Sequence, residues 1–226
     1  MSHGKHFTLF TDVRGPNVWK VAMIIAELGL DYEPKYLDFS KQEQKSPEHT
    51  QYNPNGRIPT LIDHANNDFV VWESNAILLY LVEKYDTEHK ISVSVVNEKV
   101  HQLQWLFFQA SGQGPYYGQA TWFIRYHPEK IPSAIERYRK EVIRVIGVLE
   151  SVLSKQDWLV GGKCTIADIS FVPWNIFAFR RLSTDDSDVN LERDFPAVTK
   201  WHNAMLKRHA IAEQIKLRQS LLEEQT

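Results

Sequence analysis

Two short segments in the first third of the chain combine residues that could hold one end of a small peptide. Residues 53–59 read Asn-Pro-Asn-Gly-Arg-Ile-Pro and precede an apolar run, and residues 72–74 read Trp-Glu-Ser and precede a helical pattern. Pro59 lacks an N–H and biases Ile58 toward an extended backbone, whose N–H and C=O can pair with an extended ligand. Ser74 stands where an N-cap belongs, so the helix amides behind it favour a carboxylate. The alternative is that the same residues only form a turn, two strands and a capped helix, and bind no ligand.

A third point of chemical interest is Asn17, which follows Gly15 and Pro16 at the start of a predicted helix. The unpaired amides of a first helical turn and the helix dipole make this an electropositive end. Lowering the pKa of a bound thiol from about 8.5 by two units requires about 2.7 kcal/mol. The helix terminus supplies about 0.3 to 1 kcal/mol and one hydrogen bond to a charged acceptor about 1.5 to 3 kcal/mol, which together suffice. The alternative is that Asn17 only satisfies the helix terminus.

The second half of the chain carries a folding motif beside its single cysteine. Thr165 and Asp168 have the spacing of a capping box, and Cys164 with Ile169 fits the hydrophobic staple around it. We therefore interpret Asp168 as a helix cap rather than a catalytic acid, and Cys164 as a small buried side chain rather than a nucleophile. The nine histidines show no metal-ligand spacing, so no metal site is expected.

The elements that must position these residues alternate between strands and helices up to about residue 85. The helix that begins at Pro16 has apolar residues at helical spacing and Gly29 just past its end. The pattern predicts a βαβ unit followed by ββα, which forms a compact mixed sheet. The predicted strands and helices are residues 6–10, 16–28, 32–37, 60–63, 69–72 and a helix after Ser74 to about residue 85.

The rest of the chain has a helical pattern nearly to its end. Residues 86–98 are polar at first and lack a helical period, so we place a linker there. Residues 103–108 are apolar almost all round, which predicts a central buried helix. The expected fold is therefore an α/β domain over residues 1–85 followed by an all-α domain over residues 99–226.

The composition excludes several classes of function. At 226 residues with a formal net charge of −2, the chain is typical of a globular protein of one large or two modest domains. Basic residues are scattered among acidic ones, so no nucleic-acid partner is expected. No segment has the apolar length of a membrane span, and residues 1–15 lack the pattern of a signal peptide. One cysteine agrees with a reducing compartment, so we expect a cytoplasmic location.

Five motifs, taken in order along the chain, resemble the Nu-class glutathione transferases, in particular the fungal branch similar to the yeast nitrogen-catabolite regulator. The motifs are residues 15–17, 53–59, 72–74, 105–118 and 165–174. The resemblance implies a thioredoxin-like N-terminal domain with a cis bond before Pro59, an all-helical C-terminal domain and a homodimer with two glutathione sites. One departure is Gly15, where relatives often place Ser or Thr, so a possible hydroxyl donor to the thiolate is absent.

The resemblance also assigns roles to individual residues of this sequence. Asn17 takes the catalytic position that hydrogen-bonds the glutathione sulfur, and Ile58 pairs with the cysteinyl backbone. Glu73 and Ser74 bind the amine and carboxylate of the γ-glutamyl group.

Further assignments concern the other end of glutathione and the second substrate. Gln44 lies in the loop expected near the glycyl end, and Lys41 and Arg57 are further candidates there. Five residues of the helical domain are implied near the pocket for the second substrate: Tyr116, Tyr117, Trp122, Phe123 and Arg137.

The function implied is that of a glutathione-dependent enzyme whose nucleophile is the thiolate of glutathione, bound reduced or as its disulfide. No protein cysteine stands at the start of the first helix, so the enzyme would not form a mixed disulfide with a cysteine of its own there. We expect reduction of small disulfides with some conjugation of electrophiles. Two alternatives stay open: conjugation as the main reaction, or a non-catalytic regulatory protein that binds glutathione.

Overall fold

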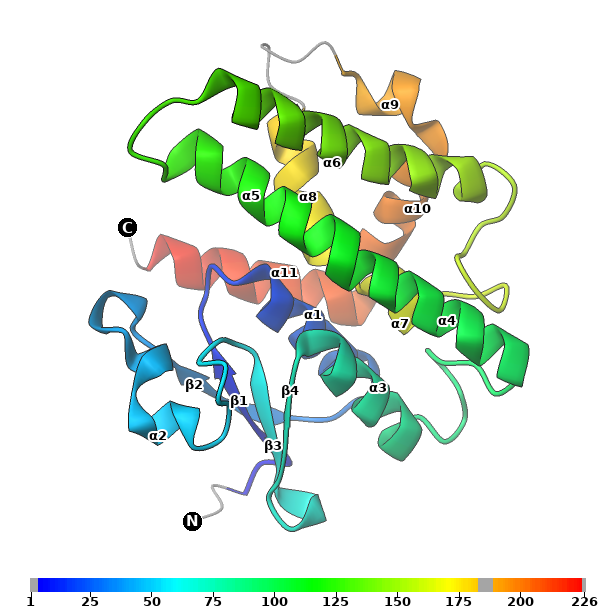
Figure 1. The fold of residues 1–226 in the computed structure, drawn as a ribbon. Helices are drawn as coiled ribbons and strands as arrows, with labels where there is room; N and C mark the ends of the chain where they lie inside the picture. Colours follow the sequence, from blue (N-terminus) through cyan, green and yellow to red (C-terminus); the bar gives the residue numbers. More distant parts are fainter. Residues whose placement is uncertain (1–3, 183–188, 225–226) are drawn as a thin grey trace. The chain divides into compact units, whose positions relative to one another are not determined.

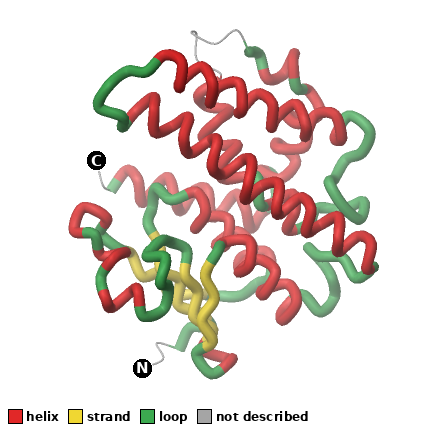
Figure 2. Tube along the Cα trace, viewed as in Figure 1, coloured by secondary structure: helices red, strands yellow, loops and turns green. Residues whose placement is uncertain are grey.

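The computed structural model describes residues 4–182 and 189–224, and these form two compact units. The first unit holds the described residues up to 92 together with those from 207 onward, and the second holds residues 93–206. Within the described residues, all strands belong to the first unit, and helices build the second (Figures 1 and 2). The expected fold class, α/β followed by all-α, is confirmed. The division differs from the expected one because the end of the chain groups with the first unit.

The first unit is built on a four-stranded mixed sheet with the order β2-β1-β3-β4. β1 pairs parallel with β2 and antiparallel with β3, and β3 pairs antiparallel with β4. The predicted strands are found within one residue of their expected ends. Their bounds are β1 (Phe7–Thr11), β2 (Tyr32–Tyr36), β3 (Thr60–Asp63) and β4 (Phe69–Trp72).

Helices and short turns complete the first unit, and α1 contacts both α3 and α11 (Figure 1). At the end of α1, Gly29 adopts a φ of +68°, and its amide donates to the Ala26 carbonyl at 3.0 Å, as the glycine at this position predicts. The bounds are α1 (Pro16–Glu27), η1 (Phe39–Lys41), η2 (Glu43–Lys45), α2 (Pro47–Thr50), η3 (His64–Asn66), α3 (Ser74–Tyr85) and α11 (His209–Glu223).

The start of α3 differs from the prediction that Ser74 is its N-cap. Glu73 occupies the N-cap, with a φ of +69° and no side-chain hydrogen bond to the helix, and Ser74 is the first helical residue. A positive φ is uncommon for a residue other than glycine, and such strained conformations gather at functional sites. The prediction was wrong because the side-chain preferences of N-caps do not report the backbone conformation that the β4–α3 turn imposes.

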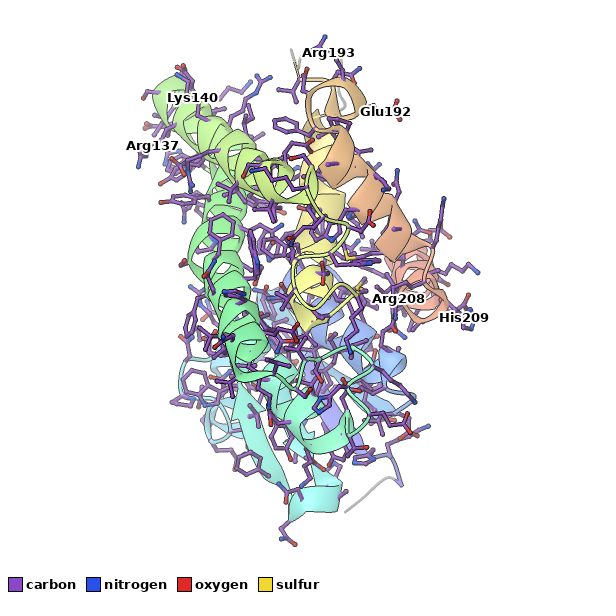
Figure 3. The ribbon with its side chains drawn as sticks, turned by 90° about the vertical axis from the view of Figure 1, so that its right-hand side faces the viewer. Arg137, Lys140, Glu192, Arg193, Arg208 and His209 are labelled. Carbon is purple, nitrogen blue, oxygen red and sulfur yellow. The ribbon has the colours of Figure 1, made fainter. Side chains whose placement is uncertain are left out.

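The last helix, α11, is joined to α1 by polar contacts near both of its ends. At its start, Arg208 makes a two-pronged ion pair with Glu27, with distances of 2.7 and 2.6 Å (Figure 3 labels Arg208). Farther along, the Nε of Arg218 donates to the Val13 carbonyl at 3.1 Å. Because the Glu27 side chain is only 8% exposed, this ion pair is less screened than a surface pair.

The second unit consists of helices. Its α4 passes through a π-helical turn, η4, into α5, and α5 contacts α6. Within the described residues of the chain, no helix has the length and apolar character needed to cross a membrane. The bounds are α4 (Val96–Phe108), η4 (Gln109–Gln113), α5 (Gly114–Arg125), α6 (Pro132–Leu153), α7 (Ile166–Ile169), α8 (Val172–Leu182), α9 (Leu191–Asp194) and α10 (Pro196–Leu206).

The helix predicted to be buried all round, α4, is buried on one side only. Trp105 and Leu106 are 8% and 2% exposed, whereas Phe107 is 70% exposed. Val96 and Val100 are exposed as well, and they follow the helical spacing that leads to Phe107. The α4 helix therefore presents an apolar stripe, formed by Val96, Val100 and Phe107, on its surface within the second unit.

The predicted capping box at the start of α7 is confirmed. Thr165 accepts a hydrogen bond from the Ala167 amide, and Asp168 accepts from the Thr165 amide at 2.8 Å. Asp168 is fully buried and also accepts from the Leu159 amide and the Trp201 indole, each at 2.9 Å. The carboxylate therefore joins three separate segments of the second unit.

Replacing Asp168 with Ala should destabilise the protein more than the loss of an ordinary cap. The variant leaves the buried Leu159 amide and the Trp201 indole without their acceptor. At about 1 to 3 kcal/mol for each unsatisfied donor, we expect a loss of about 2 to 6 kcal/mol in unfolding free energy. Denaturant titration measures it. The control is Asp157→Ala, which removes an exposed ion pair with Lys200 and should cost at most about 1 kcal/mol. Equal losses in the two variants would contradict the structural role of Asp168.

Candidate ligand-binding site

The first unit contains a pocket of about 380 Å³ near the N-terminal ends of α1 and α3. It brings together the segments that the sequence singled out: the start of α1, residues 53–59 and the β4–α3 turn. Five of the predicted glutathione-binding residues line it. The lining residues are Asn17, Asn53, Asn55, Arg57, Ile58, Pro59, Glu73 and Ser74.

The loop over residues 53–59 is held by a buried polar network that starts at Asn53. The Asn53 amide nitrogen donates to the Arg57 carbonyl at 2.7 Å and to the Thr60 hydroxyl at 2.9 Å. His49, which is 1% exposed, contacts the same hydroxyl at 3.0 Å and the Gln44 carbonyl at 2.9 Å. These contacts tie both ends of the loop to the first residue of β3.

Ile58 joins this loop to the hydrophobic core of the first unit. The Ile58–Pro59 peptide bond is cis, as the resemblance implied. The Ile58 side chain packs against the buried cluster of Phe10, Leu37 and Ile62. This packing fixes the position of the Ile58 backbone beside the pocket.

At the start of α1, the N-cap is Gly15, and Asn17 lies in the first turn. A Cβ atom at position 15 would lie 3.2 Å from Ile58 Cδ1, which is tighter than usual contact. Because the Gly15 N-cap supplies no side-chain hydrogen bond to the helix, the electropositive end of α1 is open to a ligand. Asn17 lines the pocket at this end and can donate its side-chain amide to an anion.

Beside the start of α3, a buried lysine lies next to the pocket-lining residues. Lys20 is 1% exposed, and its Nζ donates to Ser74 Oγ and to Asn75 Oδ1, each at 2.9 Å. Burial lowers the pKa of Lys20 to about 7, and the nearby charge of Glu73 opposes that shift. The hydroxyl of Ser74, which lines the pocket, is therefore hydrogen-bonded to the buried amine of Lys20.

Two of the predicted residues near the glycyl end of glutathione are not part of the pocket lining. Lys41 is exposed on η1 and forms an ion pair with Asp38 at 3.1 Å. The Oε1 atom of Gln44 is buried and has no hydrogen-bond partner in the structure. Gln44 does lie close to the loop, since its carbonyl accepts from His49 and would be 2.9 Å from a Cβ atom at position 56.

The residues implied for the second substrate all lie on α5 and α6, within the second unit. Tyr117 belongs to the core at 3% exposure, and burial raises its pKa. Phe123 stacks on Tyr138 with ring centroids 5.4 Å apart, and the Tyr116 ring lies 6.5 Å from the same Tyr138. Trp122 is 48% exposed.

Arg137, the last of these residues, is exposed on α6 (Figure 3). The four aromatic residues therefore differ in environment, from the buried Tyr117 to the exposed Trp122.

Sequence reasoning missed His49 and Lys20, although Lys20 left a signal. It lies within a run of residues from Val18 to Ile25 that are otherwise apolar, so a lysine there must either break the buried face or serve a polar partner. No comparable signal in the sequence indicates His49. It precedes the loop by several residues, and only the folded chain shows that its ring reaches Thr60.

The donor set of the pocket fits a small peptide that carries a thiol, a carboxylate and an amine. The start of α3, with Ser74 and the amine of Lys20, favours a carboxylate, and the Glu73 carboxylate favours an amine. Asn17 and the start of α1 favour a thiolate. Among the described residues, no three His, Cys, Asp or Glu side chains are grouped to hold a metal ion.

Comparison with known sequences decides the family. The pattern described as "Glutathione S-transferase, N-terminal domain" matches residues 5–83, and "Glutathione S-transferase, C-terminal domain" matches residues 115–209. The chain belongs to the glutathione transferase family. It is 52% identical to Glutathione S-transferase 1 of Schizosaccharomyces pombe over 212 residues, which cover 90% of this chain and 93% of that one.

Solved structures place this family member beside Ure2-type glutathione transferases. The structure of glutathione transferase URE2P6 from Phanerochaete chrysosporium, in complex with oxidized glutathione, is 61% identical with a TM-score of 0.93 and covers 97% of this chain and 99% of that one. Ure2p5 from the same organism, cocrystallized with 1-(S-glutathionyl)-2,4-dinitrobenzene, is 56% identical with a TM-score of 0.91, and each chain is fully covered. The resemblance read from the sequence is confirmed, and residues 5–83 of the first unit form the family's thioredoxin-like N-terminal domain.

Proposed function

We propose that this family member is a glutathione-dependent enzyme that reduces small disulfides, with some conjugation of electrophiles beside it. The observation that carries the proposal is the position of Asn17 in the first turn of α1, on the lining of the same pocket as Glu73 and Ser74. A peptide held by its γ-glutamyl end at α3 would place its thiol toward an electropositive helix end and an amide donor.

Each residue of the pocket has a separate task in this proposal. Ser74 and the first amides of α3 bind the γ-glutamyl carboxylate, and Glu73 binds the amine. Ile58 pairs through its backbone with the cysteinyl residue, and Arg57 with Gln44 and Lys41 binds near the glycyl end. Asn17 donates its side-chain amide to the sulfur, which lowers the pKa of the thiol by stabilising its charged form.

Bound glutathione supplies the thiolate that attacks one sulfur of a small disulfide, forming a mixed disulfide and releasing the other sulfur as a thiolate. A second glutathione thiolate completes the reduction, with glutathione disulfide as the product. Attack on sulfur requires a thiolate and an aligned target, but no acid placed on a leaving group. The single cysteine of the chain, Cys164, is buried, so the reaction does not use a protein thiol.

Conjugation is the second candidate function, and a specific finding favours it. The similar Ure2p5 was cocrystallized with a glutathionyl dinitrobenzene, which is the type of product that conjugation forms. The similar URE2P6 was solved with oxidized glutathione, which is a disulfide. A shared thiolate serves both reactions, so the second substrate decides between them. A non-catalytic regulatory protein that binds glutathione would show neither reaction.

The proposed assembly is a homodimer located in the cytoplasm. On the second unit, the apolar stripe of α4 is exposed, with Val96 and Phe107 at 73% and 70%. On the first unit, the edge strand β4 exposes Phe69 and Trp72 at 48% and 37%. A second copy of the chain that covered these side chains would remove both apolar surfaces from water. The cytoplasmic location rests on the single cysteine, which suits a reducing compartment.

Replacing Asn17 with Ala should slow turnover at neutral pH and leave the fold intact. The change removes one hydrogen bond to a charged acceptor, worth about 2 kcal/mol, which corresponds to about a thirtyfold lower rate. Stopped assays of disulfide reduction at several pH values measure the effect, and the deficit should shrink as rising pH ionises the thiol without help. An unchanged rate at every pH would remove Asn17 from the mechanism.

Disulfide reduction should exceed conjugation when the two are compared at equal glutathione concentration. The substrates are a small hydroxyalkyl disulfide and a chlorinated nitroaromatic, and the measured quantity is kcat/KM for each. Conjugation that is faster by tenfold or more would replace reduction as the main reaction. Absence of both reactions in a protein that still binds glutathione would favour the regulatory alternative.

The matched control for this comparison is Cys164→Ser, which tests the protein thiol. We expect it to keep both activities, because the buried Cys164 lies in the second unit and the thiolate comes from glutathione. A variant that binds glutathione normally but no longer reduces disulfides would contradict the glutathione-thiolate mechanism.

A charge placed in the apolar stripe of α4 should weaken the dimer. Val100 is 56% exposed, so Val100→Asp introduces no buried charge in the single chain but would bury one between two copies. Sedimentation velocity should show a shift toward the monomer at micromolar concentration. The control Leu217→Asp alters an exposed apolar residue on α11 and should leave the assembly unchanged. A Val100→Asp protein with the sedimentation of the parent would exclude this stripe from the interface.

A further inference from the structure

Lys20 is a buried basic group to which the proposed mechanism gives no task. It follows Asn17 by three residues on α1, so both side chains lie on neighbouring positions of one helix face. Its Nζ is within 2.9 Å of Ser74 Oγ and of Asn75 Oδ1, at the first two positions of α3. An amine buried to this extent is costly unless its partners compensate for the loss of water.

The direction of the hydrogen bond between Lys20 and Ser74 depends on the protonation of the amine. A protonated amine has three donors and no acceptor, so Ser74 Oγ must accept from it. The Ser74 hydroxyl proton is then available to point into the pocket that Ser74 lines. A neutral amine has a lone pair that can accept the same hydroxyl proton, which would turn Ser74 away from a ligand carboxylate.

We propose that Lys20 is a positioning residue whose protonated amine orients the Ser74 hydroxyl toward the ligand carboxylate, so that ligand binding draws a proton onto Lys20. The inference rests on the proposed binding of the γ-glutamyl carboxylate at Ser74. The carboxylate adds a negative charge close to a buried amine, and an opposite charge nearby favours the charged form. Lys20 touches Ser74 and Asn75 rather than reacting atoms, so it acts through them.

The other charged groups around α1 can be assigned to separate interactions. At the N-cap of α3, the carboxylate of Glu73 is the charge that favours protonation of Lys20. At the N-cap of α11, Arg208 is paired with Glu27 at the opposite end of α1. Arg218 donates to the Val13 carbonyl and is influenced by the charge of Asp12. Lys20 is therefore the amine of α1 that contacts the start of α3.

The expected pH dependence has a defined sign. In the free protein, burial lowers the pKa of Lys20 to about 7, and the bound carboxylate raises it. Binding is then strongest where Lys20 is protonated before the ligand arrives, and it weakens as pH rises above about 7. If binding raises the pKa by two units or more, the dissociation constant should increase about tenfold from pH 6 to pH 8.

The experiment is calorimetric titration of the full-length protein with S-methylglutathione, whose blocked sulfur contributes no proton of its own. Titrations at pH 7.5 in two buffers of different ionisation enthalpy give the number of protons taken up on binding. We expect an uptake of about 0.7 proton in the parent protein. The dissociation constant is measured in parallel at pH 6, 7 and 8.

Two variants and one control separate a titrating role from a merely structural one. Lys20→Met should lose the uptake and bind about a hundredfold more weakly than the parent at pH 6, with no dependence on pH up to pH 8. Lys20→Arg keeps a permanent charge, so it should also lose the uptake while its affinity at pH 8 stays close to that at pH 6. Lys216→Met, which alters an exposed lysine of α11, should behave as the parent does.

Several results would overturn the inference. The inference would be overturned if the parent protein bound S-methylglutathione with no proton uptake and with a constant affinity from pH 6 to pH 8. This result needs no variant, so it is decisive even if Lys20→Met fails to fold. The same uptake in Lys20→Met as in the parent would assign the proton to another group. A parent protein that does not bind S-methylglutathione at all would refute the proposed function and this inference together.

Discussion

The candidate site depends on one buried side chain, Asn53, because that amide holds the loop that closes the pocket. Loops are usually exposed since their backbone groups need hydrogen-bond partners. Here the partners are internal: Asn53 bonds to Arg57 and Thr60, and His49 bonds to Thr60 from the other side. The loop can therefore lie against the sheet in a fixed conformation, with Ile58 packed into the core. A rigid loop presents its backbone to a ligand without a large entropic cost.

The pocket also shows how a fold can gather positive potential from helix ends and a buried amine, in addition to the exposed Arg57 of its lining. The starts of α1 and α3 both contribute to its lining, and neither has a side-chain cap that would neutralise its amides. The Lys20 amine adds a positive charge when it is protonated, yet only 1% of its surface is exposed. The anionic parts of a ligand thus meet oriented amides and a shielded amine, whereas the bulk solvent meets a protein of nearly neutral charge. The strained Glu73 backbone between β4 and α3 places the single carboxylate of the lining beside them.

Much of the first unit could be predicted because its signals are local. Pro16 and Gly29 mark the two ends of α1, and the alternation of strand and helix patterns predicts the strand ends to within one residue. Motif residues of this unit also line one pocket. The misses have a common cause, which is that tertiary packing overrides local preference. Ser74 is a favoured N-cap residue, but the β4–α3 turn puts Glu73 there with a positive φ.

The second unit shows the same limit of local reasoning. Phe107 was expected in a core because its neighbours are apolar, but it is exposed on the side of α4 that its own unit leaves open. The pairing of Thr165 with Asp168 was predictable as a helix cap. The other two donors to Asp168, Leu159 and Trp201, were not predictable, since they lie outside the capping motif.

The return of α11 to the first unit has a consequence for how the chain is made. A ribosome delivers the residues of the sheet first, but α1 keeps one side uncovered until the helix that begins at His209 has been synthesised. The ion-pair partner of Glu27, Arg208, is likewise synthesised only after the whole second unit. The ligand-binding unit can therefore complete its packing only after the whole all-helical unit has been synthesised. The part of the chain that is made first is thus among the last to reach its final packing.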